Sequence, residues 1–208
     1  MNRKITLILV IAIAAGLGLA LSNSFFGGKH TQIPLPALQT AKLIDSPRAL
    51  PPFSLASTQG PITAEQLKGH WTVIFIGFTH CPDVCPTTLT DLARAQAIWA
   101  ASDLPNKPKL LFVSIDPERD TPKLIAEYAA FFSKDTLTAT TAEPQLAEFI
   151  RALGLVYMKV PQGNSYTMDH SATLLLLNPK AEFAGLIRPP LKPEALAQDL
   201  ITLSKTQP

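Results

Sequence analysis

Residues 72–88 read TVIFIGFTHCPDVCPTT and hold both cysteines of the 208-residue chain. The apolar run at the start of this stretch predicts a buried strand at about 72–78. A residue that precedes a proline is pushed out of the helical region, so Cys81 and Cys85 should both lie ahead of the next helix, at about 86–100. The stretch therefore predicts a strand, a loop with two thiols, and a helix.

Both sulfurs would then lie near the positive end of a helix, which lowers the pKa of a thiol. A thiolate is the nucleophile of disulfide exchange and also the ligand that soft metals prefer. The motif alone thus predicts either a redox pair or a metal site. A structural disulfide is a third interpretation, but the spacing is too tight to link distant segments.

The rest of the chain predicts an α/β domain. We expect strands at about 110–115, 156–160, 172–177 and 182–187, and helices at about 122–132, 141–154 and 193–203. The order β-α-β-α-β-β-α is that of the thioredoxin-like fold, a central mixed sheet flanked by helices. In that layout strand 172–177 runs antiparallel beside strand 72–78.

This topology predicts where the site lies. The loop that enters an antiparallel strand lies at the same end of the sheet as the loop that leaves its parallel neighbour. His170 should therefore lie near Cys81 and Cys85, and Asp116 belongs to the same edge. Two thiolates and one imidazole suit copper(I), or copper(II) with an added oxygen ligand. Structural zinc takes four protein ligands, and the chain has no third cysteine to supply one. A catalytic zinc site can be built from two Cys and one His with an open position, so zinc stays an alternative to copper.

Other polar residues near these three have less direct roles. His80 is expected beside the metal rather than bound to it, and Asp169 is expected to hydrogen-bond the histidine that follows it or to hold the loop. Asp116 is expected in a turn, with orientation of the site as the other interpretation. His30 and His70 are expected at the solvated surface.

The N-terminal segment predicts a membrane anchor. Arg3 and Lys4 precede a charge-free apolar run that extends, with Phe25 and Phe26, to the ~20 residues that span a bilayer. We expect a signal anchor over residues 1–26 with its basic end in the cytoplasm, and export of everything after it. A cleaved signal peptide is the competing interpretation.

The remainder divides into a linker and one domain. Residues 27–52 are rich in proline and predict an extended tether, and residues 53–205 predict a single domain. Beyond residue 30 the chain carries 15 basic and 16 acidic residues and no basic stripe. Nucleic acid is therefore not an expected partner.

Three blocks of sequence resemble, in order, the Sco/SenC family of copper metallochaperones for cytochrome c oxidase assembly. They are residues 77–89, 113–122 and 169–172. The resemblance, which covers roughly residues 53–203, implies copper ligands at Cys81, Cys85 and His170. It also implies partners, namely the oxidase subunit that carries the copper A site and a copper donor, and a single-pass location in a bacterial inner membrane with the domain in the periplasm. The turn at 178–181 departs from the family, which commonly has an Asp and a Gly there.

The alternative is an enzyme, a membrane-tethered thiol-disulfide oxidoreductase that reduces cysteines of a partner. Three residues rather than two separate the cysteines, which argues against ordinary thioredoxin chemistry. The usual cis-proline position of the fold carries His170 and Ser171 instead. A thiol peroxidase would want an arginine in the thiol loop, which has none. Chaperone and reductase are compatible roles, because cysteine ligands must be reduced before they take up copper.

Overall fold

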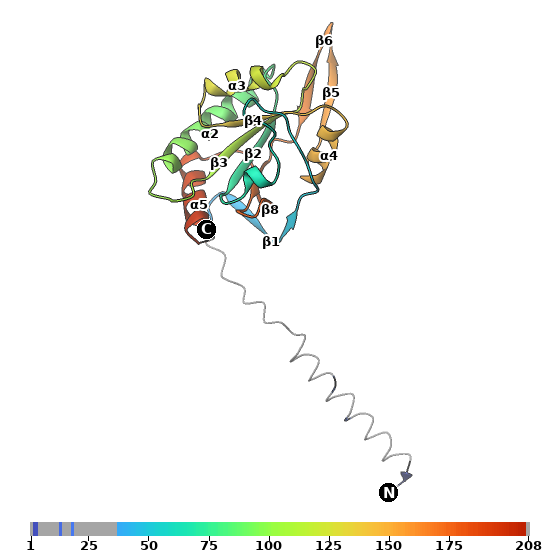
Figure 1. Ribbon diagram of the computed structural model, residues 1–208, viewed down its shortest axis with the longest axis vertical. Helices are drawn as coiled ribbons and strands as arrows, with labels where there is room; N and C mark the ends of the chain where they lie inside the picture. The colour runs from blue at the N-terminus through green and yellow to red at the C-terminus, as the bar shows by residue number, and fades with distance from the viewer. Residues whose placement is uncertain (1, 4–12, 14–17, 19–36, 207–208) are drawn as a thin grey trace. The chain divides into compact units, whose positions relative to one another are not determined.

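A mixed sheet of six strands, in the order β1-β8-β7-β2-β3-β4, forms the centre of the domain (Figure 1). The computed structural model describes residues 2–3, 13, 18 and 37–206. The elements are β1 (Ala41–Ala49), η1 (Glu65–Leu67), β2 (Thr72–Gly77), α2 (Val84–Ala100), β3 (Lys109–Ser114), α3 (Pro122–Ala130), β4 (Leu137–Ala139), α4 (Gln145–Ala152), β5 (Tyr157–Gln162), β6 (Ser165–His170), β7 (Leu174–Leu177), β8 (Glu182–Ile187) and α5 (Pro193–Thr206).

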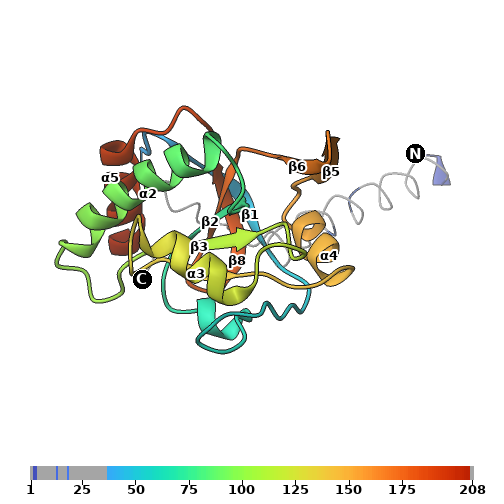
Figure 2. The same ribbon diagram turned by 90° about the horizontal axis from the view of Figure 1, so that it is seen from above.

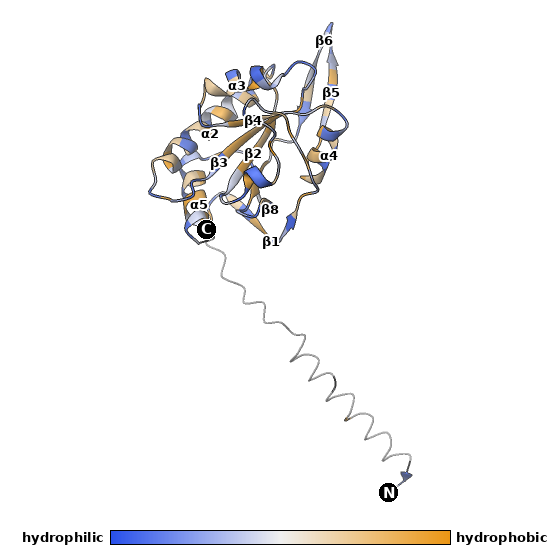
Figure 3. Ribbon diagram, viewed as in Figure 1, coloured by the Kyte–Doolittle hydropathy of each residue, from blue (hydrophilic) through white to orange (hydrophobic). Residues whose placement is uncertain are grey.

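The central strands have the predicted topology. β2 runs parallel to β3, with Thr72 opposite Lys109, and antiparallel to β7, with Thr72 opposite Leu177. All six residues of β2 are buried, and residues 73–76 are continuously apolar, as expected for a strand that is covered on both faces. Figure 3 shows this concentration of hydropathy in the middle of the sheet. The expected mixed sheet flanked by helices is confirmed.

Helices α2 and α5 pack side by side against the sheet (Figures 1 and 2). Leu89, Leu92 and Trp99 form the buried stripe of α2. The expected helices at 86–100, 122–132 and 193–203 are present with shifted ends, and the helix expected from 141 begins at Gln145. The short strand β4 and the strand β6 were not predicted.

The predicted limit of the tether at residue 52 is wrong. Residues 41–49 form β1, which pairs with β8 at the edge of the sheet. The carboxylate of Asp199 in α5 accepts backbone N–H bonds from Gln39, Thr40 and Ala41, at 2.7–2.9 Å, and so fixes the start of the strand. The folded domain therefore includes β1 and does not begin at 53.

The predicted anchor, residues 1–26, and the first part of the tether lie outside the described residues, apart from the isolated positions 2–3, 13 and 18. Among residues 2–3, 13, 18 and 37–206, no helix is long and apolar enough to cross a bilayer.

The turn between β7 and β8, whose sequence departs from the resembling family, is built around the side-chain amide of Asn178. The Asn178 side-chain oxygen accepts hydrogen bonds from the backbone N–H groups of Lys180 and Glu182, both at 3.0 Å. Ala181 has a φ of 60°, in the region that favours glycine. Asn178 thus supports a turn that the alanine adopts under strain.

Candidate metal centre

Cys85 lies in the first turn of α2 and is fully buried. Cys85 was expected ahead of the helix, because Pro86 follows it. The fixed φ of Pro86 nevertheless suits the first turn of a helix. A 3.2 Å bond from the Thr87 N–H to the Asp83 carbonyl closes that turn. Burial raises the pKa of the Cys85 thiol. The expectation of a lowered pKa is therefore wrong for Cys85 in the metal-free protein, since loss of solvation outweighs the helix end.

Cys81 lies at the amino end of α2 and is half-buried. Its sulfur accepts the backbone N–H of Cys85 at 3.3 Å. Both cysteines are free thiols. The more accessible of the two sulfurs is therefore that of Cys81.

His170 ends β6 and reaches the buried thiol. Its Nε2 lies 3.7 Å from the Sγ of Cys85, and its Nδ1 lies 3.0 Å from the carbonyl oxygen of Ser171. A carbonyl can only accept, so Nδ1 carries the proton and the lone pair of the neutral ring is on Nε2. Burial lowers the pKa of His170, which keeps the ring neutral. The nitrogen that can bind a metal thus faces Cys85.

The spacing of Cys85 and His170 fits a shared metal ion. Two ligands at ~2.3 Å for sulfur and ~2.0 Å for nitrogen, the lengths that zinc makes, lie about 3.5–3.8 Å apart. Within the described ranges, however, no three His, Cys, Asp or Glu side chains are already grouped for a metal. The three proposed ligands are therefore not yet arranged as a complete metal site.

Two aspartates hold the surrounding segments. Asp120 has no exposed surface and accepts bonds from the N–H and hydroxyl of Thr79, at 2.9 and 2.5 Å, and from the hydroxyl of Ser114, at 2.5 Å. Asp116 accepts the hydroxyl of Tyr166 at 2.8 Å and the Nε–H of Arg119 at 2.5 Å. Asp120 therefore holds the backbone two residues before Cys81, whereas Asp116 bonds a side chain of β6, the strand that ends at His170.

Among the described residues, His80 and Asp169 make no hydrogen bond to either cysteine sulfur. The ring of His80 is half exposed, with its Nδ1 3.0 Å from the Thr79 hydroxyl and 3.7 Å from Asp120. Asp169 is exposed and directly precedes His170 on β6. Neighbouring residues of a strand point to opposite faces, so the two side chains lie on opposite sides of β6. Of the three residues predicted around the ligands, Asp116 is the one that bonds to the strand of His170, through the hydroxyl of Tyr166.

Three contributors were missed from the sequence: Tyr166, Arg119 and Asp120, the last of which was not considered as a residue of the site. The bonds of Asp120 could not be predicted from the residues around it, because its partner Thr79 lies 41 residues away in the sequence. Tyr166 could have been found only by predicting β6.

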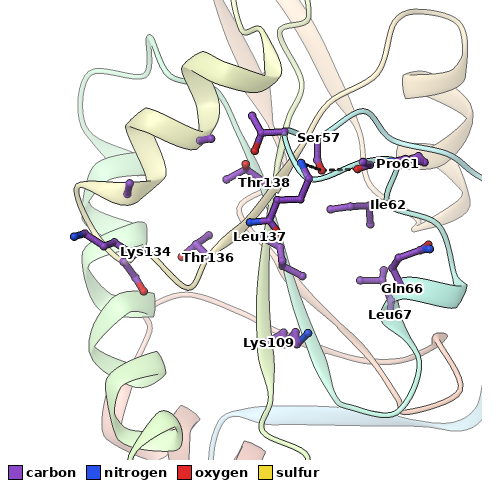
Figure 4. A pocket seen from close by; sticks show the side chains of 16 residues that line it. Ser57, Pro61, Ile62, Gln66, Leu67, Lys109, Lys134, Thr136, Leu137 and Thr138 are labelled. Carbon is purple, nitrogen blue, oxygen red and sulfur yellow. Dashed lines mark hydrogen bonds between the residues drawn. The ribbon is translucent and has the colours of Figure 1, made fainter.

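A polar pocket of about 310 Å³ lies elsewhere (Figure 4). Its lining includes Ser57, Lys109, Lys134 and Thr138. Lys109 begins β3, whereas Asp116 follows the end of that strand. The pocket is thus at the other end of β3 from the two cysteines and is not part of the candidate metal centre.

A family model described as SCO1/SenC matches residues 41–205. The chain belongs to the SCO1/SenC family. The resemblance predicted from the three sequence blocks is thereby confirmed. The match begins at the first residue of β1, in agreement with the earlier start of the domain.

Individual SCO proteins are similar over most of the folded domain. The mitochondrial SCO1 homolog of Homo sapiens is 37% identical over 136 residues, which are 64% of this chain and 45% of the human protein. The structure of Bradyrhizobium japonicum ScoI with copper bound is 34% identical, with a TM-score of 0.67 over 74% of this chain and 98% of that one. Arabidopsis thaliana ScoI with copper bound is 30% identical, with a TM-score of 0.69 over 76% and 98%. The chain thus spans less than half of the human relative.

Proposed function

We propose that this protein is a copper metallochaperone that binds copper through Cys81, Cys85 and His170 and supports assembly of the copper A site of cytochrome c oxidase. The observation that carries the proposal is the 3.7 Å approach of the unprotonated His170 Nε2 to the Cys85 sulfur. Two thiols and one imidazole match copper better than oxygen-preferring metals. Solved SCO1/SenC relatives with copper bound support the choice of metal.

The accessibility of the ligands suits a metal that is cargo. Cys85 is fully buried, whereas Cys81 and His170 retain partial exposure. An incoming ligand of a donor or of the oxidase subunit that carries the copper A site could reach a metal on that side. Three protein ligands also leave room for it, unlike the four of a closed structural site.

The proposal extends to the cell. Residues 1–26 would anchor the chain in a bacterial inner membrane, and the segment before β1 would be a tether that lets the domain reach its partners in the periplasm. The support is the apolar run that follows Arg3 and Lys4. Tethering raises the effective concentration of a carrier near a membrane-bound target.

Metal reconstitution tests the ligand set. The full-length chain, purified in detergent and reduced, should bind one copper(I), and X-ray absorption should show sulfur scatterers with one nitrogen or oxygen. Replacement of a neighbouring residue commonly costs 10–100-fold in metal affinity, so Cys81→Ser and Cys85→Ser should cost more. His170→Ala should remove the nitrogen scatterer.

Variants of nearby side chains serve as matched controls. Asp169→Asn and His80→Ala alter residues next to two of the proposed ligands and should retain one copper per chain. An all-sulfur site in the wild type, or a nitrogen scatterer that persists in His170→Ala, would refute the assignment of His170.

A thiol-disulfide reductase is the second candidate. It is favoured by two free thiols, of which Cys81 is half-buried at a helix amino end. Complementation of a deletion strain separates the two roles, because His170→Ala removes a metal ligand and leaves both thiols. Full rescue of oxidase activity by His170→Ala, with failure of Cys81→Ser, would favour the reductase. Failure of both favours copper delivery.

A further inference from the structure

The β5–β6 hairpin, which carries His170, stands apart from the main sheet. In the part of the chain that the structure describes, its two strands pair only with each other, from Tyr157 opposite His170 to Gln162 opposite Ser165. Figure 1 shows the hairpin extending beyond the sheet. A strand that the sheet does not hold depends on side-chain contacts for its position. These contacts place the imidazole together with the packing of the His170 ring against Phe75 and Phe78.

Tyr166 makes most of those contacts. Its hydroxyl donates to the Asp116 carboxylate at 2.8 Å, and its backbone carbonyl accepts from Arg119 at 3.1 Å. The Arg119 guanidinium carbon lies 3.7 Å from the centre of its ring, and the Lys159 ammonium lies 3.9 Å from it. Lys159 also bonds Glu118 at 2.6 Å. We call Asp116, Arg119, Lys159 and Tyr166 the Tyr166 clamp.

The clamp is coupled to the metal centre on two sides. Tyr166 and His170 lie four residues apart on β6, so their side chains are on the same face of the strand. Asp116 belongs to the segment that ends with Asp120, and Asp120 holds Thr79, two residues before Cys81. One short segment therefore bonds both to the thiol loop and to the strand with the histidine.

We propose that Tyr166 and Arg119 are positioning residues for His170. The inference rests on the proposed function, because it takes His170 as a copper ligand. When the clamp is loosened, the strand that carries the imidazole is held less firmly, while Cys85 stays on α2 and Cys81 stays in the loop before it. Soft thiolates alone can retain copper(I), whereas copper(II) depends more on the imidazole. The clamp therefore selectively supports copper(II) binding and lowers the copper(II)/copper(I) reduction potential.

Graded variants test the proposal in the full-length chain. Tyr166→Leu removes both the ring and the hydroxyl, and Tyr166→Phe removes only the bond to Asp116. Arg119→Met removes the guanidinium and its charge. Arg119→Lys keeps the positive charge but removes the planar guanidinium with its several N–H donors. Arg94→Met is the matched control, because it breaks another arginine–carboxylate pair, 2.9 Å from Glu194, that joins α2 to α5.

The expected result is a change in the copper signature that the control does not show. Tyr166→Leu and Arg119→Met should bind copper(II) about tenfold more weakly, with copper(I) affinity changed less. The nitrogen hyperfine coupling in the copper(II) electron spin resonance spectrum should weaken, and the reduction potential should rise. Tyr166→Phe and Arg119→Lys should lie between these variants and the wild type.

Two results would overturn the inference. One is a copper(II) affinity and nitrogen coupling in Tyr166→Leu equal to those of Arg94→Met. The other is an equal loss of copper(I) and copper(II) together with a lower melting temperature, which is the mark of a merely structural role. If Tyr166→Leu does not fold, Tyr166→Phe and Arg119→Lys decide by the same measurements. Failure of the proposed function gives a different result. In that case the wild type binds no copper, or His170→Ala binds copper in the same way as the wild type.

Discussion

At the scale of single residues, the absence of a side chain at Gly77 makes room for the Cys85 sulfur. A Cβ built on Gly77 would lie 2.9 Å from that sulfur and 3.0 Å from the Cε2 atom of Phe112. Phe112 is stacked on Phe75, with ring centroids 5.6 Å apart, so it has little freedom to retreat. A glycine at the end of β2 is therefore required by the position of the thiol.

Gly77→Ala should consequently disturb the metal centre. We expect a loss of about 1–3 kcal/mol in the free energy of unfolding, the usual cost of overpacking a core. Copper affinity should also fall, because the sulfur is the atom that must move. Urea denaturation and chelator competition measure the two effects. Adding Phe112→Leu should recover part of the stability. Wild-type stability and affinity in Gly77→Ala would show that the contact is relieved without displacing Cys85.

The sequence predicted the proposed ligands better than it predicted their surroundings. Cys81, Cys85 and His170 could be grouped because topology alone brings two loops to one edge of the sheet. The roles of Tyr166 and Arg119 depend on a hairpin whose short, polar strand β6 has no distinctive apolar pattern. The pKa of Cys85 could not be predicted either, since the burial that raises it is a property of the packed core.

At the scale of elements, α5 holds the chain at the point where β1 begins. The Asp199 carboxylate is 2% exposed, and it accepts three backbone N–H bonds and the hydroxyl of Thr40, at 2.8 Å. The strand also approaches β8 closely, because a Cβ on Gly185 would lie 2.7 Å from the carbonyl oxygen of Lys42. These contacts fix the point where the chain enters the domain.

Asp199→Ala should release the start of β1. It leaves three backbone donors without their acceptor, and we expect a cost of about 3 kcal/mol because bonds to a charged group are the stronger kind. Hydrogen exchange should accelerate at Gln39, Thr40 and Ala41. Thr40→Val is the matched control, since it removes one of the four bonds and should cost about 1 kcal/mol. Unchanged protection of the three amides in Asp199→Ala would contradict this account.

Elements differed in how far sequence could predict them. β2 and β3 were predicted because buried strands are continuously apolar. β1 was mistaken for tether because it carries Lys42, Asp45 and Arg48 and its pairing with β8 is interrupted between Leu43 and Arg48. A charged edge strand is typical of sheets that avoid further pairing, and its partners on β8 are 133 or more residues away in the sequence.

At the scale of the whole molecule, a second histidine couples stability to pH. His70, expected at the surface, is 8% exposed, so that expectation is wrong. The loop that carries it is fixed by a 2.8 Å bond from Gly69 N–H to the Pro179 carbonyl. Burial, with the nearby Lys109 charge, lowers the pKa of His70 to about 4. The pKa of His170 is lowered in the same direction.

The metal-free protein should therefore lose stability as the pH falls from about 6.5 to about 4. In that window the unfolded chain binds protons at these histidines and the folded chain does not, so protonation favours unfolding. At ~1.4 kcal/mol per pH unit, His70 alone accounts for at most about 3 kcal/mol. Urea denaturation of the full-length chain at several pH values measures the slope. His70→Gln removes one titrating group, and its stability should depend less steeply on pH than that of the wild type between pH 6.5 and 4, even where its absolute stability is lower. Equal slopes in the two proteins would mean that His70 titrates alike in the folded and unfolded chains, and that its burial does not exclude the proton.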